Sequence, residues 1–251
     1  MEEMTGSKPA GAGMAGSGMA EAVSSAKLPT GVPGFDAFLG GGLERRVITQ
    51  FFGEGGSGKS TIALRAAVSA LSKGTGVIYI DTEGFSAERF CQIAGDKAEE
   101  YAKSLYVYEP SSFAEQGQVI SESERLLHRG QAGLLILDSA TALYRVESGG
   151  KDAMARLSQQ MMVLLGISRR FDIPVVITNQ VFMDIDSHRL TGLGGTALFH
   201  ISKVIVRIEK HEGFRRAVIV KHRSEAEGKS WDFVLTGDGI RGRTGEGVRH
   251  D

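Results

Sequence analysis

Eight consecutive residues, Gly53-Glu-Gly-Gly-Ser-Gly-Lys-Ser60, follow the pattern G-x-x-x-x-G-K-[ST], which is suited to binding phosphate. Its glycines allow successive backbone N–H groups to turn inward around phosphate oxygens, where side chains would obstruct them. Lys59 is expected to reach the β- and γ-phosphates, and the Ser60 hydroxyl to bind Mg²⁺. The sequence therefore predicts a site for ATP or another nucleoside triphosphate. The residues expected to contact the nucleotide here are Gly53, Glu54, Gly55, Gly56, Ser57, Gly58, Lys59, Ser60 and Thr61.

Two carboxylates at strand ends are suited to phosphoryl chemistry. The apolar run 134–137 delivers Asp138 at the carboxyl end of a buried strand, where ligands bind in open α/β sheets. We expect Asp138 to hold Mg²⁺ together with Ser60. Glu83 follows another strand, and its length and position suit a carboxylate that orients the water attacking the γ-phosphate. The alternative role for an acid at such a place is to cap a helix or to lie solvated in a loop, and Asp81 or Thr82 suits that role.

A third strand end, Ile177-Thr-Asn179-Gln180, carries amides able to contact the γ-phosphate and to relay its presence to the following loop. Loops at strand ends are commonly polar, so these amides alone do not establish a site.

Alternating strands and helices are expected to position these groups. Apolar strands are predicted at 47–52, 76–81, 105–108, 134–137 and 174–178, and helices at 60–71, 87–94, 113–128 and 152–171. Near-continuous apolar strands separated by helices indicate an α/β fold: a mostly parallel sheet covered on both faces. Three further strands, at 204–208, 216–220 and 231–235, follow without helices and predict a C-terminal antiparallel extension.

The ends of the chain differ in composition from this core. Residues 1–27 are rich in Gly, Ala, Ser and Met, cannot bury a core, and are predicted to be disordered. The folded core is expected over 28–240, and a loose Gly/Arg-rich tail over 241–251.

Composition excludes several classes of protein. The 251 residues carry a formal net charge of −1, so any contact with nucleic acid must come from local patches. One cysteine, Cys91, excludes an internal disulfide framework and fits a reducing cytosol. Neither a transmembrane run nor a signal peptide is recognised, which predicts a cytoplasmic protein.

Three segments are the most informative for assigning the chain to a family: Tyr79-Ile-Asp-Thr-Glu-Gly84, Asp138-Ser-Ala-Thr-Ala-Leu-Tyr-Arg145 and Val175-Val-Ile-Thr-Asn-Gln-Val181. Gly194-Gly195 and His200 follow them in the chain. Together they resemble the RecA-type recombinase superfamily, on its archaeal and eukaryotic side, and most closely its short archaeal paralogues. The resemblance covers roughly residues 28–240 and implies a RecA-type P-loop ATPase core. A weaker similarity of residues 30–42 to KaiC-like signalling ATPases is the alternative from another class.

The resemblance also implies roles for individual residues. Glu83 matches the catalytic glutamate, Gln180 the γ-phosphate sensor, and Arg89 the arginine that stacks on adenine. Lys59 completes the catalytic set, and ATP and Mg²⁺ are the implied cofactors. Two loops of the family face DNA, and in this chain their candidate DNA contacts are Arg145, Lys151, Arg156, His188 and Arg189.

Departures from the family pattern define the expected function. No phenylalanine precedes Phe35, so the family's Phe-x-x-Ala docking segment is not found, and about 27 residues stand where a helical DNA-binding domain is usual. Only 13 residues separate Gln180 from Gly194, and the stretch 221–227, which caps ATP across the subunit interface in recombinases, lacks proline. We expect an accessory protein with weak ATP hydrolysis and no strand exchange of its own; the alternative within the family is an active filament-forming recombinase.

The partners implied are DNA, single-stranded or branched and bound without sequence preference, a RadA-type recombinase, and a Holliday-junction resolvase; no membrane is implied. Residues 203–229 hold eight Lys and Arg against four Glu. Two interpretations stay open for them: a basic DNA-binding surface, or charges on exposed edge strands that discourage aggregation.

Overall fold

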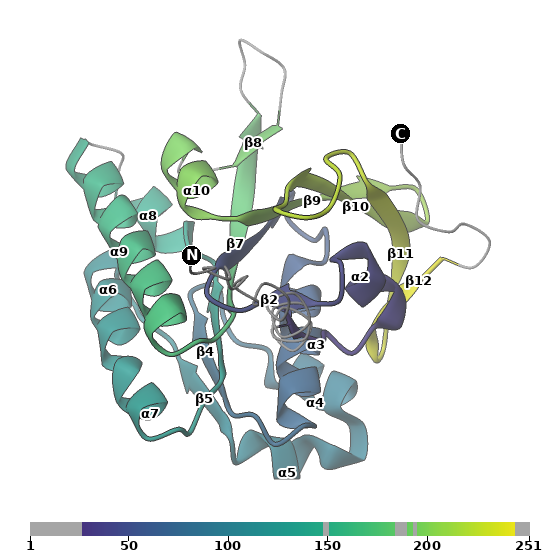
Figure 1. Ribbon diagram of the computed structural model, residues 1–251, viewed down its shortest axis with the longest axis horizontal. Helices are drawn as coiled ribbons and strands as arrows, with labels where there is room; N and C mark the ends of the chain where they lie inside the picture. Colours follow the sequence, from purple (N-terminus) through teal and green to yellow (C-terminus); the bar gives the residue numbers. More distant parts are fainter. Residues whose placement is uncertain (1–26, 148–150, 184–189, 193–194, 244–251) are drawn as a thin grey trace, which may run out of the picture.

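The computed structural model describes residues 27–147, 151–183, 190–192 and 195–243 (Figure 1). Residues 1–26 of the predicted disordered segment, residues 244–251 of the predicted tail, and the candidate DNA contacts His188 and Arg189 lie outside the described residues.

Strands of one large sheet form the centre of the molecule. They are β3 (Ile48–Gly53), β4 (Val77–Asp81), β5 (Leu105–Tyr108), β6 (Leu134–Asp138), β7 (Val175–Met183), β8 (Leu190–Gly192), β9 (Val204–His211), β10 (Phe214–Lys221), β11 (Ser230–Thr236) and β12 (Gly239–Gly242). A separate two-stranded ribbon joins β1 (Lys27–Leu28) to β2 (Leu43–Glu44).

The order across the large sheet is β12-β11-β10-β9-β3-β7-β6-β4-β5, with β8 paired to β7. Strands from β9 to β5 in this order run parallel, and β9 to β12 pair antiparallel. The predicted α/β fold with an antiparallel C-terminal extension is therefore confirmed. The register places Gly53 beside Gln180 and Asp81 beside Asp138, so the carboxyl ends of four strands form one edge.

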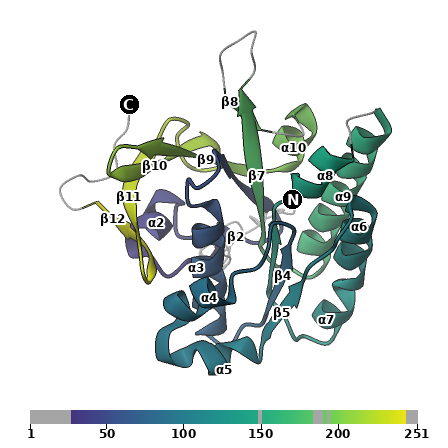
Figure 2. The same ribbon diagram turned by 180° about the vertical axis from the view of Figure 1, so that it is seen from behind.

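Helices cover both faces of the parallel part (Figures 1 and 2). One group contains α2 (Pro33–Phe38), α3 (Lys59–Leu71), α4 (Ala87–Ala94), the 3₁₀ turn η1 (Gly95–Lys97) and α5 (Ala98–Ala102). The other contains α6 (Phe113–Glu122), α7 (Glu124–His128), α8 (Ala142–Val146), α9 (Lys151–Arg170) and α10 (Gly195–Ile201).

The alternating direction of side chains along each strand explains why a hydrophobic core forms on each face of the sheet. Val77 and Tyr79 of β4 belong to the core under α3 and α4, whereas Ile78 and Ile80 belong to the core under α6 and α9. Successive side chains of a strand point to opposite faces, so a strand that is apolar throughout buries both.

Helix α2 packs on the antiparallel extension and links the two ends of the fold. Phe35 is fully buried, and its ring lies 5.3 Å from that of Trp231 and 6.0 Å from that of Phe51 (centroid distances). Trp231 in turn stacks on Phe233 at 5.5 Å. An N-terminal helix, the first strand of the parallel sheet and a late strand thus share one aromatic cluster.

Element boundaries differ from the expected ones in a few places. The helix expected over 113–128 breaks at Ser123, whose hydroxyl donates to the Ile120 carbonyl. The strand expected to end at Thr178 continues to Met183 because β8 pairs with it. Strand β1 begins at Lys27, and β12 ends at Gly242.

Candidate nucleotide site

The phosphate-binding loop connects β3 to α3 as the motif predicts. Helix α3 begins at Lys59, directly after Gly58, whose φ is 105° and which offers no side-chain cap. The first N–H groups of a helix have no partner within it, and the helix dipole places positive charge there. This helix end is therefore suited to a phosphate group.

Close packing explains why Gly53 is required at the start of the loop. A Cβ atom added there would lie 2.2 Å from the backbone oxygen of Ile208 on neighbouring β9. At Gly55, in contrast, an added Cβ meets nothing within 4 Å, so this part of the loop borders open space. The loop is thus fixed on its strand and open at its centre, as a phosphate cradle requires.

Lys59 is buried and folds back over the loop. Its Nζ donates to the carbonyls of Gly53 (3.0 Å) and Glu54 (2.9 Å). Burial lowers the pKa of Lys59, although the nearby carboxylates of Glu83 and Asp138 favour its charged form. An anionic ligand at the loop would compensate the cost of burying this ammonium group.

Asp138 lies at the end of β6 and is only 3% exposed. The Tyr79 hydroxyl donates to its Oδ2 at 2.7 Å, and the Thr178 hydroxyl donates to its Oδ1. Burial, followed by the Asp138 charge, raises the pKa of Tyr79 well above its usual value, which keeps it a donor. Two neighbouring strands therefore hold this carboxylate in one orientation.

The donors near the loop fit Mg²⁺ bound together with a nucleotide. Asp138 and the exposed Ser60 hydroxyl offer hard oxygen ligands, which Mg²⁺ prefers. In the described ranges no group of three or more His, Cys, Asp or Glu side chains is arranged to hold a metal by itself. Mg²⁺ usually takes only one or two carboxylates and obtains its remaining ligands from phosphate and water, so this donor set suits it.

Asp81 holds the turn after β4 and does not cap a helix, since the N-cap of α4 is Ser86. Its Oδ1 accepts the backbone N–H groups of Glu83 (2.9 Å) and Gly84 (2.5 Å). Burial, together with the charge of Asp138, raises the pKa of Asp81 to about 6, against these hydrogen bonds. The turn after β4 is thereby fixed, and with it the backbone that carries Glu83.

The phosphate-binding loop and the carboxylates described above border one pocket of about 180 Å³. The phosphate-binding loop, the start of α3, Glu83, Asp138 and Gln180 line it, and Leu235 of β11 closes one side. Gln180 donates from Nε2 to Glu83 Oε1 at 2.8 Å. The predicted lysine, magnesium aspartate, glutamate and sensor amide thus converge on one volume.

The two amides of Asn179 and Gln180, within β7, have different environments. Asn179 is buried and its Oδ1 accepts the Thr141 hydroxyl at 2.7 Å, inside the protein. Gln180 faces the pocket and also accepts a hydrogen bond from Arg145 Nη1 at 2.7 Å. Only Gln180 is therefore placed to respond to a nucleotide.

Arg89 lies on α4 and reaches the turn between β11 and β12. Its guanidinium donates to the carbonyls of Thr236 (2.7 Å), Gly237 (3.0 Å) and Gly239 (3.4 Å). A guanidinium donates in its own plane, and stacking on adenine, the contact that the resemblance implies, stays a prediction. Arg89 is not among the residues that line the pocket described above.

The candidate DNA contacts are only partly described. Arg145 on α8 bonds to Gln180, whereas Arg156 on α9 pairs with Glu147 (2.8 Å) and lies over the Phe113 ring. The backbone of Lys151 begins α9, and its side chain is not described.

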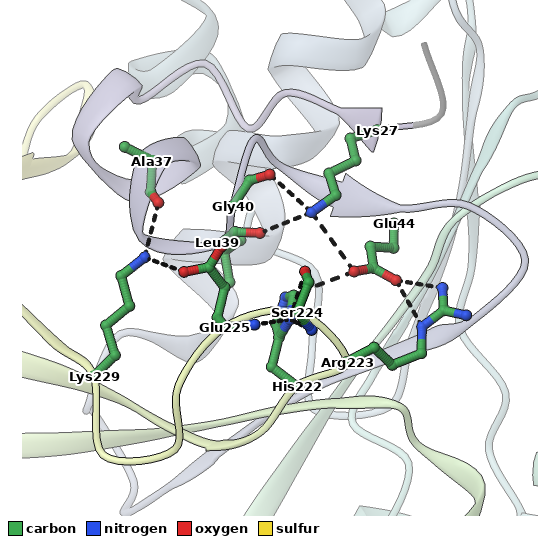
Figure 3. Close-up of polar contacts among 10 residues, drawn as sticks. All are labelled: Lys27, Ala37, Leu39, Gly40, Glu44, His222, Arg223, Ser224, Glu225 and Lys229. Carbon is green, nitrogen blue, oxygen red and sulfur yellow. Dashed lines mark hydrogen bonds and ion pairs between the residues drawn. The ribbon is translucent and has the colours of Figure 1, made fainter. Parts of the chain in front are cut away.

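Basic residues of the segment 203–229 are engaged within the chain. Figure 3 shows part of this network, where Arg223 and Lys27 surround the buried carboxylate of Glu44, and Lys229 pairs with Glu225 (2.5 Å). The other cations also have contacts: Lys203 with the His200 carbonyl, Arg207 with Glu209, Lys210 with the Gly55 carbonyl, Arg215 with the Phe214 carbonyl, Arg216 with Asp232, and Lys221 with the Phe199 carbonyl. These contacts favour a structural role over a free basic surface.

Sequence reasoning missed four residues of the site. Tyr79 and Thr178 hold Asp138, Lys210 bonds the outside of the phosphate-binding loop, and Leu235 borders the pocket. The sequence places the first two on strands, but only the register of β4, β6 and β7 shows that they meet the same carboxylate.

Comparisons with known proteins agree with this geometry. The family model named Rad51 matches residues 23–243. A DNA repair and recombination protein RadB from Methanoculleus marisnigri is 56% identical over 218 residues, which is 86% of this chain and 97% of the relative. The RadB protein from Archaeoglobus fulgidus is 42% identical over 217 residues, 85% of this chain and 97% of its own. A crystal structure of the RadB recombinase superposes with a TM-score of 0.76 at 38% identity, covering 86% of this chain and 99% of that one.

Proposed function

This chain belongs to the Rad51 family, and we propose that it is an ATP- and DNA-binding accessory protein of homologous recombination and DNA repair. The observation that carries the proposal is the convergence of Lys59, Asp138, Glu83 and Gln180 on one pocket beside the phosphate-binding loop. The family match favours recombination over the signalling ATPases that the sequence left as an alternative. None of the helices in the described part of the chain combines the length and apolarity that crossing a membrane requires.

The proposed roles follow from position. Backbone N–H groups of the loop and Lys59 hold the phosphates, and Ser60 and Asp138 hold Mg²⁺, which when bound neutralises developing charge on the phosphate oxygens. Glu83 orients a water and takes its proton, because its exposed side chain lines the pocket. Gln180 donates to the γ-phosphate.

One contact supports slow hydrolysis. Glu83 Oε1 accepts the Gln180 amide, so Glu83 competes with the γ-phosphate for this amide, and part of its carboxylate is unavailable to water while the bond persists. We propose that the turnover of ATP is weak for this reason, and that nucleotide binding matters more than its hydrolysis.

Another observation supports an accessory role without strand exchange. The stretch 221–227 is anchored to its own core, since Arg223 bonds Glu44 and Lys229 bonds both Glu225 and the Ala37 carbonyl (Figure 3). We propose that this anchoring restrains the stretch from capping ATP on a neighbouring subunit, and that the protein instead modulates a RadA-type recombinase or a junction resolvase.

The test is the binding of labelled single-stranded DNA across a salt series, with and without ATP, with hydrolysis measured in the same samples. The proposal expects DNA binding with a steep salt dependence and little stimulation of hydrolysis by DNA. Strong stimulation would instead indicate an active recombinase. Absence of DNA binding at every salt concentration would contradict both and favour a signalling ATPase.

A further inference from the structure

Six arginines gather at the edge of the sheet opposite the nucleotide pocket. We call them the arginine face: Arg45, Arg46, Arg125, Arg129, Arg169 and Arg170. The first two lie shortly before β3, the next two on or just after α7, which leads to β6, and the last two end α9, shortly before β7. These three strands are parallel neighbours, so the segments before them meet at the amino edge of the sheet. The pocket borders the carboxyl ends, and the six residues of β3 separate the two edges by about 20 Å.

Helix α7 lies beside the end of α9 (Figures 1 and 2). Arg170 Nη1 bonds Glu124 Oε2 at 2.7 Å, and the centroid of the His128 ring lies 4.9 Å from that of Phe171. Arg125 stands three residues before His128 and therefore shares its side of α7. These contacts make the ends of the two helices one surface.

The turn before β3 is held against the same helix end. Arg45 Nη1 donates to the Asp172 carbonyl at 2.7 Å, and Arg46 Nη1 donates to the Arg169 carbonyl at 3.2 Å. Among the residues that the structure describes, Arg46 (φ 66°) and Asp172 (φ 52°) are the two non-glycine residues with positive φ. A left-handed backbone is unfavourable for arginine, so these contacts fix the turn in a conformation that it would not adopt alone.

Positive charge on this surface is largely uncompensated. The six arginines stand with the carboxylates of Glu124 and Asp172, in a chain whose formal net charge is −1. Arg125, Arg129 and Arg169 are exposed, and no hydrogen bond or ion pair to another described residue engages their guanidinium groups. The arginine face is therefore a local positive patch on a chain that is nearly neutral as a whole.

The composition of the patch favours nucleic acid over an acidic protein as its partner. None of the large apolar side chains that are exposed in the described part of the chain lies in its three segments. Those side chains are Val107, Val146, Met162, Phe199 and Leu235. Protein interfaces have an apolar centre, whereas interfaces with nucleic acid are more polar and much more positive. The planar fork of arginine also matches the geometry of phosphate.

We propose that the arginine face binds the phosphate backbone of a nucleic acid strand, as a second binding surface apart from the candidate DNA loops at the carboxyl edge. The inference rests on the proposed function only for DNA as the partner. Phosphate contacts give affinity without sequence preference and with strong salt dependence. No residue of the arginine face lines the pocket, so binding at this surface does not require ATP.

The experiment measures the binding of fluorescent oligo(dT) to the nucleotide-free protein at several salt concentrations. The first variant is Arg125→Gln/Arg129→Gln, since neither side chain has a bond to lose within the described chain. We expect it to bind about tenfold more weakly at low salt. The slope of log affinity against log salt should become shallower by about 1.4, because each single-strand phosphate contributes about 0.7. Arg169→Gln is an independent variant from α9, with an expected change in slope of about 0.7.

Two further variants separate local charge from other effects. Arg125→Lys/Arg129→Lys keeps the charge and should keep the wild-type slope, because counterion release follows charge. Lys97→Gln/Arg241→Gln removes the same charge from other parts of the surface, where Lys97 pairs with Glu100 (2.8 Å) and Arg241 with Asp238 (3.7 Å). This matched control should also keep the wild-type slope.

The outcomes distinguish this inference from the proposed function. Absence of DNA binding by the wild type at every salt concentration would contradict the proposed function. If the wild type binds DNA and both glutamine variants of the arginine face match its affinity and slope, the inference is wrong, and an acidic protein becomes the partner to seek. A lower urea midpoint with an unchanged slope would likewise overturn it, since these arginines would then serve only the helix ends.

Discussion

At the scale of single residues, Lys59 and Glu83 have separable tasks. Lys59 is buried beside the phosphate-binding loop and is proposed to hold phosphate, whereas Glu83 lines the pocket and is proposed to orient the attacking water. Lys59→Ala is expected to weaken ATP binding about a hundredfold, since it removes a desolvated charge that pairs with phosphate. Glu83→Gln should retain ATP binding and lower the hydrolysis rate about a hundredfold, the usual contribution of a general base. Equilibrium binding of a fluorescent ATP analogue and single-turnover hydrolysis separate the two effects.

Hydrolysis that persists in Glu83→Gln would exclude Glu83 as the base. A mixed result, with both variants weak in binding, would indicate that Glu83 supports the loop rather than the chemistry.

Tyr79, together with Thr178, orients Asp138, the proposed magnesium ligand. Its hydroxyl donates to Asp138 at 2.7 Å in the buried core. Tyr79→Phe removes only this hydroxyl, and we expect the Mg²⁺ concentration for half-maximal nucleotide binding to rise about tenfold, the typical effect of losing a partner of a metal ligand. Tyr106→Phe on edge strand β5 is the control, and it should leave the Mg²⁺ dependence unchanged. An unchanged Mg²⁺ requirement in Tyr79→Phe would mean that Thr178 alone orients the carboxylate.

The sequence predicts the chemical groups of the site but not their connections. Lys59 and Ser60 are visible in the glycine-rich motif, Asp138 and Glu83 at the ends of apolar strands, and Gln180 through the family resemblance. Contacts between strands that are distant in sequence depend on the register of the sheet, which the pattern does not encode. The bonds from Tyr79 and Thr178 to Asp138 are of this kind.

At the scale of elements, the loop between β10 and β11 carries a buried histidine. The His222 side chain is 1% exposed, and its Nδ1 accepts the backbone N–H groups of Ser224 and Glu225, both at 3.1 Å. Burial lowers the pKa of His222 below 6.5 because the site disfavours the charged ring, although Glu44 nearby opposes this. Burial would raise the pKa of Glu44, but the hydrogen bond and charge of Arg223, with Lys27, hold it below its usual value.

Both pKa shifts make the folded protein less stable at acidic pH. Below pH 6.5 the unfolded chain protonates His222 while the folded chain resists, so the free energy of unfolding falls as the pH drops from 6.5 toward the folded pKa. Glu44 adds a further loss below pH 4.5, as it takes up a proton in the folded state. We expect His222→Gln to weaken the dependence of the free energy of unfolding on pH between pH 7 and 5. Urea unfolding at a series of pH values measures this dependence. His211→Gln, at the exposed β9–β10 turn, should keep the wild-type slope; an equal slope in His222→Gln would exclude this histidine as the cause.

The element boundaries were predictable wherever apolar periodicity was strong, as in β4 and α9. Short elements were not: α2, α8 and α10 each span five to seven residues, too few for a helical period to emerge. Helix α2 forms because Pro33 starts its first turn and because Phe35 and Phe38 are buried against the extension.

At the scale of the whole molecule, the N-terminal and C-terminal parts of the core stabilise one another. Phe35 contacts aromatic rings from α2, β3 and β11 and is fully buried. Phe35→Ala is expected to lower the free energy of unfolding by about 3–5 kcal/mol, through lost apolar burial and the cavity that remains. Urea denaturation followed by far-UV circular dichroism measures the change.

Phe199→Ala is the matched control, because Phe199 is 44% exposed on α10. This substitution should lower the free energy of unfolding far less than Phe35→Ala does. If both substitutions had equal and small effects, α2 would not be an integral part of the fold.

The aromatic cluster around Trp231 also has an optical consequence. Trp231 is the only tryptophan in the chain, is 6% exposed, and lies against the rings of Phe35 on α2 and Phe233 on its own strand. Its intrinsic fluorescence therefore originates at a single place, the junction between the first helix and the last strands. Excitation at the red edge of the protein spectrum would report on this junction without any added dye, and a shift of the emission toward longer wavelength would mark the moment at which water reaches the indole.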